Sequence, residues 1–205
     1  MDESQTVGES FLILHGTGGN KPDHWQEHLV RELREAGADV HYPQMPRPDD
    51  PELGPWLKTL RSTLKSITRD RQLTVLTHSR GCLLWMHYAA SGDYRGPKAD
   101  RVLLVAPPYS PPTGRSGWFP MPLEAAKIAA VSRETTIIAS DDDEFATFED
   151  AQEYATALSV PIYLLSGSGH ISPYYGYGPW PWVREWCLRQ ADFPPLPNRI
   201  AEEIP

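Results

Sequence analysis

Residues 75–82 read VLTHSRGC, and this stretch decides the fold because a strand pattern changes to a helix pattern within it. The apolar run Leu73 to Thr77 is typical of a buried strand, and the apolar residues after Ser79 have the spacing of a helix. Ser79 then lies on the tight strand-to-helix turn that exposes a nucleophile above a sheet. The usual pattern there is Gly-x-Ser-x-Gly, which Gly81 fits and Thr77 does not. A serine at a helix start is also a common N-cap, so the pentapeptide alone leaves both interpretations open.

Outward from this turn, short apolar runs alternate with helix-length segments, which predicts an α/β protein. Runs this apolar indicate a parallel sheet covered by helices on both faces. Asp23 is the expected N-cap of the first helix, in which Trp25, Leu29 and Leu33 recur every four residues. We expect strands at 10–15, 38–42, 73–77, 101–106, 135–140 and 160–165, and helices at about 23–36, 53–68, 80–91, 122–131, 148–158 and 182–190.

Length and charge limit the function classes. A chain of 205 residues is long enough for a single domain that buries roughly 70% of its unfolded surface, so we expect one domain over 1–205. The net charge of −8 makes nucleic acid or an anionic membrane an unexpected partner. No apolar run approaches the ~20 residues that span a bilayer. With two cysteines and no basic start followed by an apolar core, we expect the cytoplasm, while the oligomeric state stays open.

Two proline-rich segments stand apart from this alternation. The run PPYSPPTGRSGWFPMP, at about 107–122, is long for a connection between a strand and its helix, and we interpret it as a lid-like loop. The final segment FPPLPNRIAEEIP, at 193–205, is expected to lie along the surface or to fray.

The first strand runs into His15-Gly16-Thr17-Gly18-Gly19, a loop that resembles the one supplying a backbone N–H to the oxyanion hole of α/β-hydrolases. On this interpretation Thr17 gives one donor and the backbone of Arg80 gives the second. A flexible turn and a phosphate-binding loop are the alternatives. The phosphate alternative is weaker, because Lys21 interrupts the Gly-x-Gly-x-x-Gly pattern.

An acidic run, Ser140 to Phe145, follows the fifth strand, and Ser166-Gly167-Ser168-Gly169-His170 follows the sixth. Serine, acid and histidine thus occur in the chain order of α/β-hydrolases, and all three lie at the carboxyl edge of the sheet. A serine hydroxyl needs a base to take its proton, and the imidazole needs an acid to fix its tautomer. At least two of the four acids are expected to be solvated or to cap the next helix.

With these residues in view, the chain resembles the retinoblastoma-binding-protein-9-like serine hydrolases, which are small α/β-hydrolases without a large cap domain. The resemblance runs from Phe11 to Leu188, so it covers most of the chain. Its marks are the glycine loop, the pair His24-Trp25, the His-Ser-x-Gly turn, a Ser-x-x-Asp turn and a Gly-His turn. It implies the α/β-hydrolase fold, a three-layer sandwich with a mostly parallel sheet of about six strands in the order 2-1-3-4-5-6.

Carried over to this sequence, the resemblance implies Ser79 as nucleophile, His170 as base and Asp143 as acid, counted as Ser-x-x-Asp from Ser140. Members usually have proline where this chain has Glu144, which leaves Asp142 as an alternative acid. Glycine is usual where this chain has Thr77, and this departure bears on the geometry of the turn.

The resemblance also implies hydrolysis through an acyl-enzyme, with neither a metal nor an organic cofactor. We expect an ester or thioester of a small molecule as the acyl substrate. The Arg80 side chain is expected either to bind an anionic substrate group or to pair with an acid, and Trp118 is our candidate for a wall of the substrate pocket. The alternatives are an amide or peptide hydrolase, and a non-catalytic binding protein on a hydrolase fold.

Overall fold

A parallel sheet of six strands forms the middle of the molecule in the computed structural model, which describes residues 8–109, 119–120 and 125–197. The strand order is β2-β1-β3-β4-β5-β6, and every neighbouring pair is parallel, as predicted. The strands are β1 (Glu9–Leu14), β2 (Asp39–His41), β3 (Gln72–His78), β4 (Ala99–Val105), β5 (Ser132–Ala139) and β6 (Ile162–Leu164).

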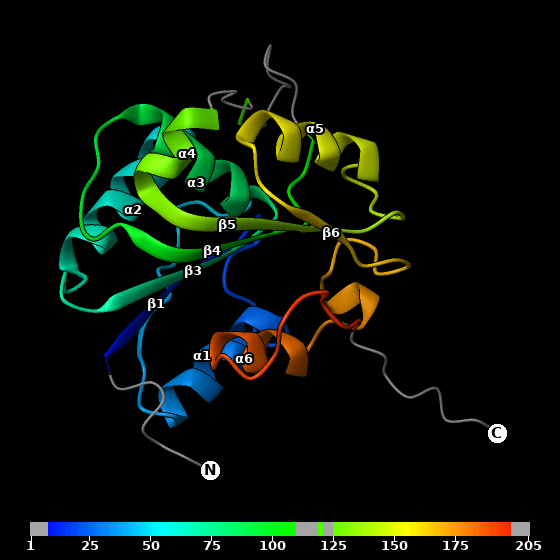
Figure 1. Cartoon of the computed structure of the whole chain (residues 1–205), viewed down its shortest axis with the longest axis horizontal. Coiled ribbons are helices and arrows are strands. Elements are labelled where there is room, and N and C mark those ends of the chain that lie inside the picture. The colour runs from blue at the N-terminus through cyan, green and yellow to red at the C-terminus, as the bar shows by residue number, and fades with distance from the viewer. Residues whose placement is uncertain (1–7, 110–118, 121–124, 198–205) are drawn as a thin grey trace.

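Helices cover both faces of this sheet and complete a three-layer sandwich (Figure 1). Four helices pack on one face and two on the other, which confirms the predicted architecture. The first group is α2 (Leu53–Ser66), α3 (Arg80–Ser91), α4 (Ala125–Val131) and α5 (Phe148–Leu158); the second is α1 (Trp25–Glu35) and α6 (Pro181–Cys187).

Alternate residues of the central strands pack into two separate cores. In β1, Leu12 and Leu14 join the cluster under α2 to α5, while Phe11 and Ile13 join the cluster under α1 and α6. All four side chains are fully buried, because successive residues of a strand point to opposite faces and both faces are covered. The continuous apolar runs in the sequence are the consequence.

The predicted apolar face of α1 is confirmed, since Trp25, Leu29 and Leu33, which recur every four residues, are buried. The expected N-cap Asp23 is wrong. His24 occupies that position, in an extended conformation, and its Nδ1 accepts the backbone N–H of Gln26 at 3.2 Å. The imidazole takes the role usually filled by Ser, Thr, Asp or Asn.

Several predicted boundaries differ from the structure, each for a local reason. β5 begins at Ser132 and not at 135, because α4 runs into it without an intervening loop. β6 is an edge strand that pairs only along three residues of β5, so it is shorter than 160–165. α6 begins at Pro181 and ends at Cys187, since Pro favours the first turn and Arg189 has a φ of 59°. A 3₁₀ helix, η2 (Pro173–Tyr175), was not predicted.

The two proline-rich segments are described only in part. Of the lid-like loop at 107–122, residues 110–118 and 121–122 lie outside the described residues. In the C-terminal segment, Phe193 stacks on Tyr163 with ring centroids 4.4 Å apart, and the Trp180 indole donates to the Leu196 carbonyl at 2.9 Å. The segment therefore follows the surface as far as residue 197. Across the described residues, none of the helices has the length and apolar character needed to cross a membrane.

Candidate active site

Ser79 lies on a strained turn between β3 and α3. Its φ of 53° and ψ of −126° lie outside the regions that residues with a side chain usually adopt. The Ser79 backbone N–H donates to the Val105 carbonyl of β4 at 3.0 Å, which ties the turn to the sheet. Strain of this kind costs on the order of 1–3 kcal/mol and persists where surrounding contacts fix it, often at functional sites. The predicted tight turn between a strand and a helix is therefore present at Ser79.

Glycines on both sides let backbone segments approach this turn. A Cβ on Gly81 would lie 2.6 Å from the Leu14 carbonyl oxygen, and a Cβ on Gly16 would lie 2.7 Å from Ser79 Cβ. Thr77, which replaces the usual first glycine, fits without such a conflict. It is fully buried, and its hydroxyl donates to the Leu103 carbonyl at 3.2 Å. The departure from the glycine pattern thus leaves the turn intact.

His170 and Asp143 complete a hydrogen-bonded chain with Ser79. His170 Nε2 lies 2.8 Å from Ser79 Oγ, and His170 Nδ1 lies 2.8 Å and 3.0 Å from the two carboxylate oxygens of Asp143. The side chains of His170 and Asp143 are only 9% and 3% exposed. Asp143 follows β5 and His170 follows β6, so the parallel sheet brings to one edge residues that are far apart in the sequence.

The neighbouring Asp142 has a different set of partners. Its Oδ1 accepts the Ser140 hydroxyl at 2.6 Å and the Gly169 backbone N–H at 2.7 Å. It therefore links the ends of two strands directly beside His170 and does not contact the imidazole through a hydrogen bond. Of the two candidates that the sequence left open, Asp143 is the one on the His170 ring.

Asp141 holds the same loop from its exposed side. It accepts the Gly167 backbone N–H at 2.8 Å and the Ser166 hydroxyl at 2.7 Å. These two hydrogen bonds, chiefly that from Gly167, lower the pKa of the Asp141 carboxyl. The three consecutive aspartates thus have three separate sets of partners on the loop after β6.

Two buried N–H donors fix the other side of the His170 loop. The His78 imidazole lies with Nε2 2.9 Å from the His170 carbonyl oxygen, so Nε2 carries the proton and donates. The Trp25 indole donates to the Ile171 carbonyl at 3.1 Å, and Ile171 has a φ of 47°. His78 immediately precedes the serine, so it couples the nucleophile turn to the loop of the histidine.

His24 and His78 pack beside His170 without adding charge near neutral pH. The ring centroids of His24 and His78 are 4.6 Å apart, and those of His78 and His170 are 4.9 Å apart. Burial is the main cause that lowers the pKa of His24, to about 3, and the nearby His170 adds to this effect. Burial is also the main cause that holds the pKa of His78 well below its usual value, and there the nearby His24 contributes. Both rings beside His170 are therefore neutral near neutral pH.

Thr17 and Arg80, the predicted oxyanion donors, line the same cavity as Ser79. Arg80 is the first residue of α3, and N–H groups in a first turn have no acceptor within their helix. The loop that carries Thr17 is fixed by His15, whose Nδ1 donates to the Gly16 carbonyl at 2.6 Å and whose Nε2 accepts the Met45 N–H at 2.8 Å. The arrangement is suited to hold a negative oxygen above Ser79.

A cavity of about 390 Å³ opens above Ser79. Its lining includes residues that the sequence did not single out, notably Lys21, Gln26 and Phe145, whose ring centroid lies 4.5 Å from that of His170. Their only signal in the sequence was their position shortly after the glycine loop or within the acidic run. The lining comprises Gly16, Thr17, Gly19, Lys21, His24, Gln26, His78, Ser79, Arg80, Phe145, His170, Ser172, Pro173 and Tyr174.

The aromatic residues on the chain after β6 differ in their surroundings. Tyr174 lines the cavity and is 88% exposed, whereas Tyr177, Trp180 and Trp182 are buried in the core under α1 and α6. Trp118 lies outside the described residues, so its predicted place in a pocket wall stays a prediction.

The side chain of Arg80, also predicted to bind substrate, reaches the cavity but is mostly buried. The residue is 6% exposed, and its guanidinium lies 5.8 Å from the centroid of the Phe119 ring. This burial lowers the pKa of the Arg80 guanidinium. The side chain is therefore packed against the protein as well as lining the cavity.

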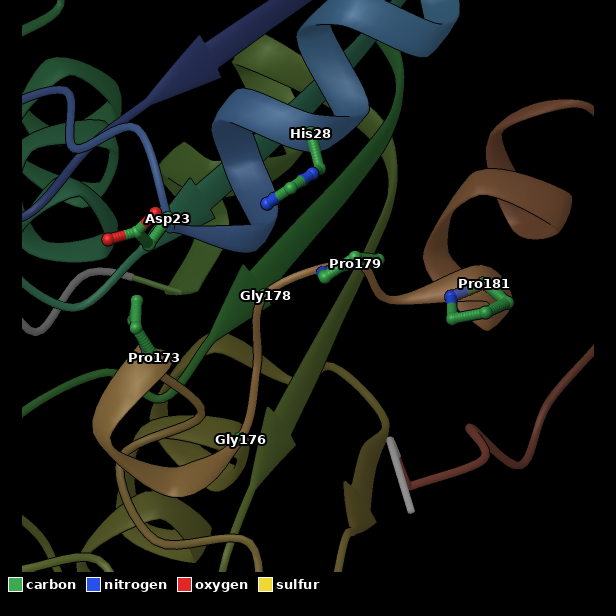
Figure 2. A pocket seen from close by; sticks show the side chains of 7 residues that line it. All are labelled: Asp23, His28, Pro173, Gly176, Gly178, Pro179 and Pro181. Atoms are coloured by element: carbon green, nitrogen blue, oxygen red, sulfur yellow. The ribbon is translucent and has the colours of Figure 1, made fainter. Parts of the chain in front are cut away.

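A second, shallow groove of about 510 Å³ lies between the start of α1 and the loop before α6 (Figure 2). Asp23 and His28 line one side, and the loop of prolines and glycines lines the other. His28 is engaged with Arg31, at 3.1 Å. Pro173 lines both hollows, but the groove holds no pairing of serine with histidine. Within the described ranges, no group of three or more His, Cys, Asp or Glu residues is placed to hold a metal ion.

Comparisons with known proteins agree with this geometry. A family model described as serine hydrolase matches residues 11–188. Serine hydrolase RBBP9 of Rattus norvegicus is 26% identical over 169 residues, which cover 79% of this chain and 86% of that protein. YdeN of Bacillus subtilis is 25% identical over 168 residues, which cover 79% of this chain and 85% of that protein. The crystal structure of the ydeN gene product from B. subtilis is similar to this structure, with a TM-score of 0.75 and 22% sequence identity. The match covers 89% of this chain and 98% of that one, and it supports the fold.

Proposed function

Because this chain belongs to the serine hydrolase family, we propose that it hydrolyses an ester or thioester of a small molecule through an acyl-enzyme formed on Ser79. The observation that carries this proposal is the hydrogen-bonded chain from Asp143 through His170 to Ser79, with both distances to the imidazole at 2.8 Å. The chain ends inside a cavity that also contains the Thr17 loop and Arg80. The residues proposed as nucleophile, base and oxyanion donors thus line the same cavity, which supports the proposal.

In the first half of the proposed reaction, Ser79 Oγ attacks the substrate carbonyl carbon while His170 Nε2 takes the hydroxyl proton. The carbonyl π electrons move to the oxygen, and the backbone N–H groups of Thr17 and Arg80 stabilise this oxyanion. His170 then gives its proton to the leaving oxygen or sulfur as the carbonyl re-forms. The alcohol or thiol departs, and an ester on Ser79 remains.

In the second half, a water molecule attacks the acyl-enzyme and His170 takes its proton. Collapse of the second tetrahedral intermediate releases the acid, and the proton returns to Ser79. Asp143 supports both halves because its carboxylate accepts the Nδ1 proton, which leaves Nε2 free to act as base. It also stabilises the imidazolium, while the neighbouring His24 and His78 stay neutral and add no repulsion.

The test is turnover of short p-nitrophenyl esters by purified variants. Ser79→Ala should lower the rate by about 10⁶, and His170→Ala should be similarly severe, because the nucleophile and base of such a unit act together. Ser62→Ala on the exposed side of α2 and His28→Ala on α1 are the matched controls. A Ser79→Ala enzyme that kept a tenth of the activity would overturn the assignment.

We also propose the cytoplasm as the compartment, on the argument from cysteine usage. Cys82 and Cys187 are both buried and free. Disulfide bonds are typical of oxidising compartments, and unpaired buried thiols fit a reducing one.

A further inference from the structure

The charged side chains that line the cavity are all cations, as far as the structure describes its walls. Lys21 and Arg80 line it, and no Asp or Glu is among the lining residues. His24 and His78 add no charge near neutral pH, since their pKa values are held far below that range. The charged side chains of the described lining are thus positive, on a chain whose net charge is −8. A cleft lined by one sign of charge concentrates substrates of the opposite sign.

Lys21 is held over the loop that carries the oxyanion donor Thr17. Gly18 has a φ of 86°, and a Cβ there would lie 2.6 Å from Lys21 Cε and 2.7 Å from Lys21 Nζ. The side chain therefore folds back over Gly18 and fills the space that the missing Cβ leaves. The positive charge of Lys21 also contributes to lowering the pKa of His24, which lines the same cavity.

Lys21 and Arg80 differ in how accessible their charged groups are to a substrate. Arg80 is buried and packs over Phe119. Lys21 is exposed, and its ammonium makes no hydrogen bond or ion pair with any residue that the structure describes. An ammonium has three donors, and the Lys21 side chain lines the cavity above Ser79. Lys21 is therefore the cation of the cavity that an incoming anion meets first.

We propose that Lys21 binds a carboxylate of the substrate, so that this enzyme acts on esters or thioesters that also carry a carboxylate group. The inference rests on the proposed function and adds the substrate class to it. One accessible ammonium matches the single charge of a carboxylate. The carboxylate belongs to the acyl group or to the leaving group, and these two sources are separated by the choice of substrate pair.

The test compares matched neutral and anionic esters. For the acyl side the pair is p-nitrophenyl butyrate and mono-p-nitrophenyl succinate; for the leaving group it is phenyl acetate and 4-carboxyphenyl acetate. In Lys21→Met, which keeps most of the apolar stem, the anionic-to-neutral ratio of kcat/KM should fall about twofold to fivefold in one pair, the range expected for an exposed ion pair. Lys21→Arg should keep the ratio near the wild-type value.

Two further measurements make the outcome decisive. Lys58→Met removes an exposed lysine on α2, away from the cavity, and should leave the ratio unchanged. In the wild type, added salt should lower the anionic-to-neutral ratio, because screening weakens attraction between exposed charges. An unchanged ratio in Lys21→Met for both pairs, including an equal loss on both members of a pair, would overturn the inference and leave the proposed function standing. A wild type that hydrolyses none of the four esters would overturn the proposed function, and this inference with it.

Discussion

The three consecutive aspartates after β5 allow a sharp prediction, because one change, Asp to Asn, tests three different environments. Asp143→Asn keeps the shape but lets an amide donate toward His170 Nδ1, which favours the wrong tautomer. The comparable change in a serine protease costs about 10⁴ in kcat, or roughly 5.5 kcal/mol at 1.36 kcal/mol per tenfold. We expect a loss of that order for Asp143→Asn.

Asp142→Asn should be much milder, because the Oδ1 that accepts from Ser140 and Gly169 is kept in the amide. The substitution removes only the negative charge of the acceptor, and a hydrogen bond to a neutral acceptor is roughly half as strong as one to a charged acceptor. The expected loss is about tenfold or less. Asp141→Asn should have the smallest effect of the three, since this carboxylate is exposed and bonds only to the outer part of the loop.

The assay is kcat and KM for a p-nitrophenyl ester at neutral pH, with circular dichroism and a thermal melt to show that each variant is folded. We expect the loss of activity to decrease in the order Asp143→Asn, Asp142→Asn, Asp141→Asn, with the main loss in kcat. A greater loss in Asp142→Asn than in Asp143→Asn would refute this expectation. So would an Asp143→Asn enzyme that retained a tenth of the wild-type kcat.

Three further predictions concern neighbouring residues. His78→Phe should lower kcat by about 10-fold to 100-fold, because the buried His170 carbonyl loses its hydrogen-bond donor and the His170 imidazole moves out of position. His78→Gln can still donate a hydrogen bond and should restore part of the rate. Equal rates in the two variants would contradict this prediction. Arg80→Ala keeps its backbone N–H, so kcat/KM for neutral esters should stay within several-fold, and a loss beyond 100-fold would count against the oxyanion role. The folded protein keeps His24 neutral down to about pH 3, so the unfolded chain takes up the proton first as the pH falls through about 6.5. The free energy of unfolding from urea titrations should therefore drop by about 1.4 kcal/mol per pH unit for this residue below that pH, a slope that His24→Gln should flatten.

Much of the fold and part of the site could be predicted because they depend on local patterns. The apolar runs of β1 and β3 identified central strands, and parallel strands place the residues that follow them at one edge. Ser79 comes directly after β3, and His170 lies on the loop that follows the edge strand β6, with glycines close to both residues. Their meeting, at 2.8 Å, follows from topology and needed no knowledge of side-chain packing.

The choice between Asp142 and Asp143 did not follow from local pattern. The two residues share one turn, and which of them faces His170 depends on hydrogen bonds to Gly169 on a different loop. Only the resemblance to a family favoured Asp143. Sequence spacing carries no information about such contacts between loops.

The supporting contacts around His170 could not be predicted for the same reason. The His78 imidazole meets a carbonyl 92 residues away in the chain, and the Trp25 indole meets one 146 residues away. His24 was missed as an N-cap because histidine is an unusual choice there. Lys21 was noted only as a break in a phosphate-binding pattern, whereas its position depends on the side chain folding back over Gly18.

The central claim is that Ser79 is a nucleophile activated by His170, and covalent labelling tests it most directly. The wild-type protein is incubated with a fluorophosphonate probe, and intact-mass and peptide analysis locate the adduct. We expect one adduct on the peptide that contains Ser79, no adduct in Ser79→Ala, and labelling slowed by orders of magnitude in His170→Ala. A wild-type protein that stays unlabelled, or an adduct that persists in Ser79→Ala, would contradict the account, and the first result would favour a non-catalytic binding protein on this fold.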